Sequence, residues 1–247
     1  AVLAMALVLA AILITVLLSM PPGLPKGRKG VKFSAVFSKS ANVNWLSAAR
    51  VFLFCARDVW FVVGIPIYFY GVLSDGSEDG NRAAFFMVGT FMAVWIILYG
   101  AVQAAAPRLL RASSCPEYEL IRAARGWAVV LFVIPAVLAA GTALSPGPTP
   151  AMTVALVIGL LVFGGLFAVN SSLHSYLILA FAQEERVTMD VGFYYMANAG
   201  GRLIGTVLSG LTYQVGGLAL CLAAAAAMVG FSALAAGRLE PHEKQAA

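Results

Sequence analysis

Charged residues are scarce in this sequence. Among its 247 residues only 11% are Asp, Glu, Lys or Arg, and there are two histidines. Soluble domains usually carry about 25% charged residues, so the composition excludes a soluble enzyme and a disordered segment. Cysteine is scarce too: Cys55, Cys115 and Cys221 are odd in number and far apart, which argues against a disulfide framework or a shared metal site. The sequence has no nucleophile–base pair, nucleotide-binding loop or metal motif, so we expect no enzyme, cofactor or metal centre.

Long apolar runs take the place of charge. Hydrophobic residues make up 61% of the chain, and its mean hydropathy is +0.90. About 20 consecutive apolar residues cross a bilayer once as a helix. Seven stretches fit this description: 1–20, 45–72, 83–106, 126–144, 151–180, 191–212 and 217–237. We therefore predict an all-α integral membrane protein with about seven transmembrane helices.

The basic residues lie in alternate connections between these stretches. Twelve of the 16 Lys and Arg residues fall in 21–44, 107–125, 183–190 and 238–247, whereas the opposite connections hold at most Arg82. Cytoplasmic loops of membrane proteins carry an excess of Lys and Arg. We therefore predict that these four segments, including the C-terminus, face the cytoplasm.

The segment 21–44 forms a long basic linker between the first two stretches. Many transporters consist of two six-helix halves, and a cytoplasmic linker, six helices and a cytoplasmic tail fit the second half. We expect 1–20 to be the last helix of a truncated N-terminal half, 45–237 a six-helix C-terminal half and 238–247 a tail. The rest of the first half is then a missing partner. The alternative is a seven-helix receptor, although a retinal protein would need a lysine in 217–237, which has none.

Three charged side chains lie near the middle of apolar stretches. Arg57 and Asp58 lie in the second stretch and Arg202 in the sixth, at depths where a charge costs at least about 2.5–3.5 kcal/mol. A guanidinium group is a planar donor suited to phosphate, arsenate or carboxylate. Tyr194 and Asn198 precede Arg202 at four-residue spacing. We predict that an anionic substrate binds to Arg57 and to this polar stripe.

The same charges allow a second interpretation, in which Asp58 forms an internal ion pair with an arginine. The partner is either Arg57 or Arg202. Because neighbouring helical residues point about 100° apart, we expect Arg57 and Asp58 not to share one direction easily. Asp58 is also a candidate for carrying a coupled proton. Arg50 lies seven residues before Arg57 and near the cytoplasmic end, where its side chain can extend toward the membrane surface.

Small residues recur every four positions in the sixth stretch, at Ala197, Gly201, Gly205 and Ser209. Such a ladder permits close helix contact, so we predict that this helix packs tightly against a neighbour. Polar residues also cluster in the fifth stretch, among them Asn170, Ser171, Ser172 and His174. They can extend a cavity wall or bond neighbouring helices.

Two segments carry a family resemblance. CARDVWFVVGIPIYFY (55–70) and GFYYMANAGGRLIGTVLSGLTYQ (192–214) resemble the organoarsenical efflux permeases of the major facilitator superfamily, the ArsJ family. QAAAPRLL (103–110) adds to the likeness. The resemblance covers most of the chain, as the second six-helix half of a permease plus the last helix of the first half.

The resemblance implies a function that composition alone does not give. In that family, glyceraldehyde-3-phosphate dehydrogenase uses arsenate in place of phosphate and forms 1-arseno-3-phosphoglycerate. The permease exports this anion across the inner membrane, and the pair confers arsenate resistance. The expected mechanism is alternating access, with proton antiport as the driving force. The alternative within the superfamily is an exporter of another organic anion or a drug.

Overall fold

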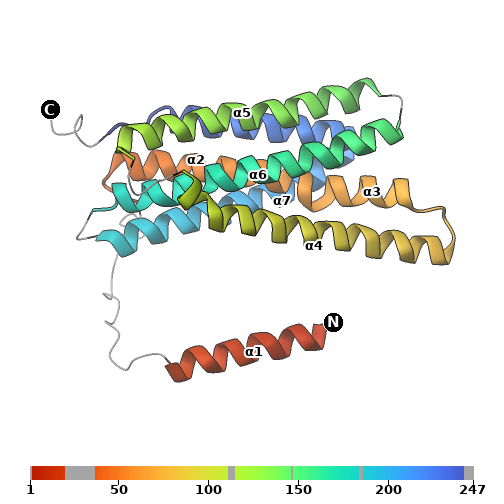
Figure 1. The fold of residues 1–247 in the computed structure, drawn as a ribbon, viewed down its shortest axis with the longest axis horizontal. Coiled ribbons are helices and arrows are strands. Elements are labelled where there is room, and N and C mark those ends of the chain that lie inside the picture. The colour runs from red at the N-terminus through yellow and green to blue at the C-terminus, as the bar shows by residue number, and fades with distance from the viewer. Residues whose placement is uncertain (1, 20–36, 111–114, 146, 184–185, 242–247) are drawn as a thin grey trace. The chain divides into compact units, whose positions relative to one another are not determined.

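The computed structural model describes residues 2–19, 37–110, 115–145, 147–183 and 186–241. These residues form helices and contain no strand, which confirms the all-α prediction for the described part of the chain (Figure 1). Five helices are long and apolar enough to cross a membrane: Ala41–Leu73, Glu78–Leu109, Glu117–Leu144, Pro150–Phe181 and Val187–Ala236. Together with the composition, they indicate an integral membrane protein.

Helix α1 (Val2–Ser19) belongs to a separate compact unit. Its 18 residues are apolar except Thr15 and Ser19. Both hydroxyls donate to carbonyls one turn earlier, Thr15 to Ala11 O at 2.8 Å and Ser19 to Thr15 O at 2.7 Å. The polar side chains of the helix are thus satisfied internally, as lipid requires. Most of the predicted linker, residues 21–36, lies outside the described residues.

The second unit begins with three consecutive helical segments: α2 (Ala41–Val59), the π-helical turn η2 (Trp60–Gly64) and α3 (Ile65–Leu73). Helix α2 starts before the predicted residue 45 because Ser40 caps it, accepting from Val43 N at 3.4 Å. The wide turn η2 ends just before Pro66. A proline lacks the N–H of a regular helix and clashes with the preceding turn, and a π-turn accommodates such a residue.

Each of the next three helices begins at a recognisable N-terminal signal. Helix α4 (Glu78–Leu109) follows Ser77, whose Oγ accepts from Gly80 N at 3.0 Å. Helix α5 (Glu117–Leu144) follows Pro116. Helix α6 (Pro150–Phe181) follows Thr149, whose Oγ1 accepts from Met152 N at 3.1 Å. The side-chain caps satisfy amide groups that have no partner within the helix.

Helix α7 (Val187–Ala236) has 50 residues, a length of about 75 Å if straight. It is interrupted at Gly216 and Gly217, where the backbone leaves helical geometry and Gly217 takes a φ of +60°. Glycine adopts a positive φ without steric cost. The predicted stretches 191–212 and 217–237 therefore both lie in α7, one on each side of this interruption.

The two parts of α7 run in opposite directions along α2 (Figure 1). Before the interruption, Gly201 approaches Val51 and Gly205 approaches Cys55, so residue numbers rise together. After it, Leu218 lies near Gly64, whereas Ser232 Oγ donates to Ala49 O at 2.8 Å. The chain therefore reverses at Gly217, and α2 packs against both parts.

Buried aromatic side chains fill the bundle around Trp60, which is 1% exposed. Its indole contacts three rings, with centroids 5.6, 6.0 and 5.2 Å away, those of Phe61, Trp95 and Phe163. Edge-to-face packing of this kind adds to the stabilisation from burial. The core thereby fixes η2 and α4 beside the charged residues of α2.

Candidate functional site

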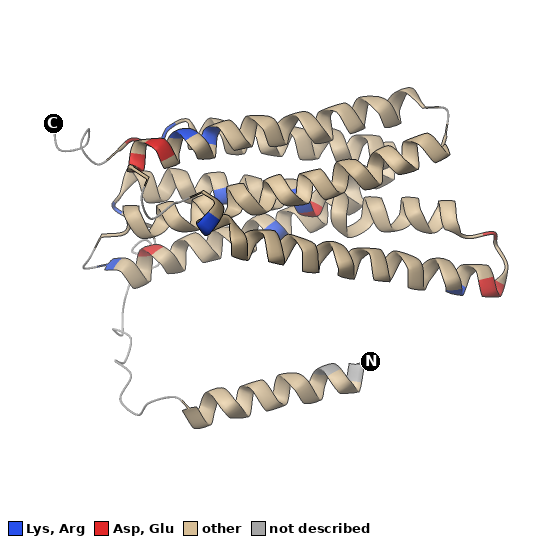
Figure 2. Ribbon diagram, in the orientation of Figure 1, with Lys and Arg blue, Asp and Glu red and all other residues tan. Residues whose placement is uncertain are grey.

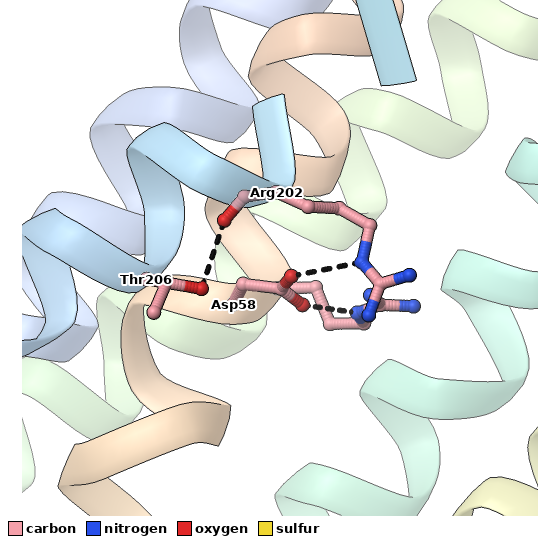
Figure 3. Close-up of polar contacts among 4 residues, drawn as sticks. Asp58, Arg202 and Thr206 are labelled. Carbon is pink, nitrogen blue, oxygen red and sulfur yellow. Dashed lines mark hydrogen bonds and ion pairs between the residues drawn. The ribbon is translucent and has the colours of Figure 1, made fainter. Parts of the chain in front are cut away.

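Asp58 lies between two arginines. Its Oδ1 is 2.6 Å from Arg57 Nε, and its Oδ2 is 3.2 Å from Arg202 Nε (Figure 3). Arg57 and Asp58 come from α2, near the middle of the span Ala41–Leu73, and Arg202 comes from the first part of α7. The structure therefore brings together the three charged residues that the sequence placed at one depth.

The expectation that Arg57 and Asp58 diverge was wrong. Their Cα–Cβ bonds do leave the helix in different directions, but the long arginine side chain curls back until its Nε reaches the neighbouring carboxylate. Asp58 is consequently shared between both arginines. One negative charge faces two positive charges, so the group keeps a net positive charge.

Burial differs sharply within this group. The side chain of Asp58 is 5% exposed and that of Arg57 is 11% exposed, whereas that of Arg202 is 59% exposed. Both arginines use Nε toward Asp58, and their terminal nitrogens have no hydrogen-bond partner among the described residues. These nitrogens remain available as donors.

A cleft of about 530 Å³ opens at the group, between α2, α4 and α7. Arg57, Asp58 and Arg202 line it together with Thr206, whose hydroxyl donates back to Arg202 O at 2.9 Å (Figure 3). The remaining walls are apolar or aromatic: Phe61, Val62, Trp95, Ile96, Tyr99, Ala199 and Leu203. A cleft of this size with few polar groups is typical of a small-molecule site.

One wall of the cleft is held rigidly by Trp95. Its indole Nε1 donates to Leu160 O of α6 at 2.9 Å, and its ring stacks on Tyr99 at 5.7 Å with an interplanar angle of 1°. Its ring also lies against Gly164, where no side chain intervenes. Contacts between α4 and α6 therefore fix the position of this wall.

Tyr194 and Asn198 do not line the cleft. Tyr194 is fully buried, and its hydroxyl lies 3.4 Å from Ser175 Oγ of α6. Asn198 has a buried Oδ1 without a partner among the described atoms. Residues four apart on a helix drift by about 40° per step, so the predicted stripe turns away from Arg202 before it reaches Tyr194.

Sequence reasoning underestimated Arg50, which does not extend to the membrane surface. It is 3% exposed, and its Nη1 donates to Ser171 O at 3.0 Å and to Ser171 Oγ at 2.9 Å. Its guanidinium carbon lies 4.1 Å from the ring centre of Phe54 and 4.9 Å from that of Tyr194. The seven-residue spacing from Arg57 was the available signal, since it places both on one side of α2.

The charged residues of the second unit otherwise gather at the two ends of the bundle (Figure 2). No group of three potential metal ligands occurs among the described residues. The three cysteines are free thiols: Cys55 and Cys221 are buried, and Cys115 is half-buried. The cleft is thus the place where the described part of the chain combines charge, depth and space.

Comparison with models of protein families, with curated proteins and with solved structures gave no match to this chain. The functional assignment therefore rests on the residues and geometry described above.

Proposed function

We propose that this chain is the second half of a secondary transporter and exports a small organic anion, which binds to Arg57 and Arg202. The observation that carries the proposal is the surplus of positive charge in the cleft: two guanidinium groups share one carboxylate and keep free terminal donors. Guanidinium forks bind carboxylate and phosphate-like anions in two-point contacts.

The exposure of Arg202 supports a two-half architecture. Its side chain is 59% exposed although it lies near the middle of the first part of α7. A charge facing lipid at that depth is costly, and such residues normally face protein or a water-filled cavity. In our proposal a first half covers this face, and the anion binds between the halves, as in transporters with midplane sites.

The finer proposal is that the anion is 1-arseno-3-phosphoglycerate. It rests on the resemblance of 55–70 and 192–214 to organoarsenical permeases of the major facilitator superfamily. Glyceraldehyde-3-phosphate dehydrogenase is then the functional partner that makes the substrate, and the activity confers arsenate resistance. This substrate carries anionic groups, which are suited to the two arginines of the cleft.

In the proposed mechanism the anion competes with Asp58 for the arginines. Asp58 is also the proposed carrier of the coupled proton in the antiport that the family resemblance implies. The effect of Asp58→Asn on the dependence of export on a pH gradient tests this role.

The test is arsenic uptake into everted inner-membrane vesicles that carry the permease with both halves. The vesicles receive arsenate, glyceraldehyde 3-phosphate and NAD, with or without the dehydrogenase. We expect arsenic to accumulate only when the enzyme is present. No accumulation by folded protein would refute the arsenical substrate, and uptake of other organic anions would then identify a different cargo.

Arginine variants test the binding site in the same assay. We expect Arg57→Ala and Arg202→Ala to abolish uptake while the protein still inserts in the membrane, because each removes a donor fork from the cleft. Arg82→Gln is the matched control, since Arg82 is an exposed arginine on α4 that does not line the cleft. Normal uptake by both cleft variants would contradict the anion site.

A further inference from the structure

Arg50 is a buried cation without a counter-charge among the described residues. It is 3% exposed, and no described carboxylate lies within ion-pair distance of it. The ionisable groups that act on it electrostatically are Tyr99, Tyr194, Tyr195 and Arg57. Buried charges in proteins are usually paired or coordinate an ion. The burial of this unpaired guanidinium group therefore calls for an explanation.

The contacts that Arg50 does make are neutral. Nη1 donates twice to Ser171, and the guanidinium carbon lies over the rings of Phe54 and Tyr194, while Nε has no partner among the described residues. Hydrogen bonds and aromatic faces stabilise a cation, but they do not cancel its charge. The position therefore remains attractive to an anion.

Further polar atoms without partners lie on α6 beside this contact. His174 is fully buried, neither of its ring nitrogens has a partner among the described residues, and it lies within electrostatic range of Arg50. It follows Ser171 by three residues, on the same side of the helix. Asn170, also fully buried, has two side-chain atoms without a partner in the described part of the chain. Such unsatisfied buried groups are rare and call for a partner.

Arg50 adjoins the cleft through one aromatic ring. The guanidinium carbon of Arg50 lies 4.1 Å from the ring centre of Phe54, and that of Arg57 lies 5.0 Å from the same centre. Tyr99, which lines the cleft, also lies within electrostatic range of Arg50. Two guanidinium groups are thus close enough for one compact molecule to reach both.

We propose that Arg50 forms a second anion subsite, which binds the far anionic group of a substrate whose near group lies at Arg57 and Arg202. This inference rests on the proposed function and narrows its substrate class to compact molecules with an anionic group at each end. Phe54 covers Arg50 in this conformation, so filling the subsite requires its ring to change rotamer.

The test compares two probes of similar size in the permease with both halves, reconstituted in lipid nanodiscs. Both 3-phosphoglycerate and glycerol 3-phosphate carry a phosphate, but only the first has a carboxylate at the other end. By titration calorimetry we expect 3-phosphoglycerate to bind at least about tenfold more tightly, a ratio typical of one well-placed charged contact. Equal affinities for the unmodified protein would overturn the subsite without any variant.

The variant Arg50→Gln tests whether Arg50 causes the preference for 3-phosphoglycerate. We expect this variant to bind both probes with the affinity that the unmodified protein has for glycerol 3-phosphate, whereas Arg50→Lys keeps part of the preference and Arg82→Gln keeps all of it. A full preference in Arg50→Gln would overturn the proposal. If the unmodified protein binds neither probe, the proposed function itself fails, an outcome that differs from binding without preference.

Discussion

Asp58 is the carboxylate that pairs with both arginines of the cleft. The sequence left two interpretations open, an anion site and an internal ion pair, and the structure contains the ion pairs. The two interpretations are compatible, because the pairs occupy only the Nε atoms of the arginines. In our proposal Asp58 competes electrostatically with a bound anion for the two positive charges, without having to leave the arginines.

Asp58→Asn should therefore tighten anion binding. The amide keeps the size of the side chain but removes the competing charge, so we expect glycerol 3-phosphate to bind on the order of tenfold more tightly, about 1.4 kcal/mol. Titration calorimetry in nanodiscs measures this, and Asp58→Glu, which keeps the charge, serves as the control. Weaker binding in Asp58→Asn would mean that the carboxylate organises the site rather than competing for it.

The same substitution tests the coupling. If Asp58 carries the proton, export by Asp58→Asn should lose its dependence on a pH gradient. The ionisable groups near Asp58 among the described residues are Arg57 and Cys55 on its own helix and Arg202 on α7. Tyr99 of α4 lines the same cleft. Uptake measured in vesicles at several imposed gradients decides the point. If export by Asp58→Asn still depends on the pH gradient, Asp58 has a structural role instead.

The depth of each charged residue along its helix was predictable from the sequence, whereas the direction in which its side chain points was not. Counting along apolar stretches placed Arg57, Asp58 and Arg202 at one level, and they meet there. The pairing of neighbours depends on side-chain rotamers, and the turn of Tyr194 away from the cleft depends on angular drift along α7. Arg50 was missed because its distance from the helix end does not reveal whether it extends outward or is covered.

At the scale of helices, α2 and α7 pack with their backbones in contact, as the ladder of small residues predicted. A Cβ added to Gly201 would lie 2.3 Å from Val51 O, and one added to Gly205 would lie 2.7 Å from Cys55 O. Backbone atoms cannot move aside as side chains do. Because Gly201 and Gly205 have no side chain, the helices that carry Asp58 and Arg202 can pack this closely in this register.

Gly201→Ala should destabilise this contact. The methyl group forces α7 away from α2, and overpacking typically costs about 1–3 kcal/mol. We expect a lower midpoint of thermal unfolding in detergent, together with weaker anion binding because Arg202 moves from Asp58. Gly200→Ala is the matched control, as a Cβ there meets nothing within 4 Å. Equal losses in both variants would contradict the close contact at Gly201 as the cause, since alanine itself favours a helix over glycine.

Gly164→Ala should disturb the cleft from a distance. A Cβ at Gly164 would lie 2.9 Å from Trp95 Cζ2, so the indole has to shift and its bond to Leu160 O lengthens. We expect anion affinity to fall several-fold because Trp95 forms a wall of the cleft. Gly165→Ala, where a Cβ meets nothing within 4 Å, should bind normally. Unaltered affinity in both variants would show that this wall does not shape the site.

The helices themselves were largely predictable from hydropathy, but their ends and contacts were not. Apolar stretches located each helix, while Ser40, Ser77 and Thr149 moved the starts outward by capping amides that the hydropathy pattern ignores. The neighbours of each helix could not be foreseen, because a helix that is apolar on all sides has no polar face to indicate its orientation.

At the scale of the whole second unit, hydrogen bonds of Arg125 and Asn42 join the helices at one end of the bundle. Arg125 of α5 donates to Ala236 O and Gly237 O at 2.9 Å each, and Asn42 of α2 donates to Glu240 O at 2.6 Å. The start of α2, the start of α5 and the end of α7 therefore lie at the same end. These ends lie in or beside the segments 21–44, 107–125 and 238–247, for which the basic residues predict a cytoplasmic location.

Cys115 provides a test of this orientation. It is half-buried in the connection after α4, whereas Cys55 and Cys221 are buried. We expect a membrane-impermeant maleimide to label Cys115 in everted vesicles and not in right-side-out vesicles, because the excess of Lys and Arg predicts a cytoplasmic location for this connection. Mass spectrometry of the labelled chain identifies the site.

Asp79→Cys in a Cys115→Ser background supplies the opposite result. Asp79 is exposed in the first turn of α4, and the 32 residues of that helix, about 48 Å long, separate it from the connection that holds Cys115. One crossing of the membrane puts the two positions on different sides, so the new thiol should react only in right-side-out vesicles. Labelling with the sides exchanged would show that the predicted topology is inverted. Labelling of both thiols from one side would remove α4 from the set of membrane-spanning helices.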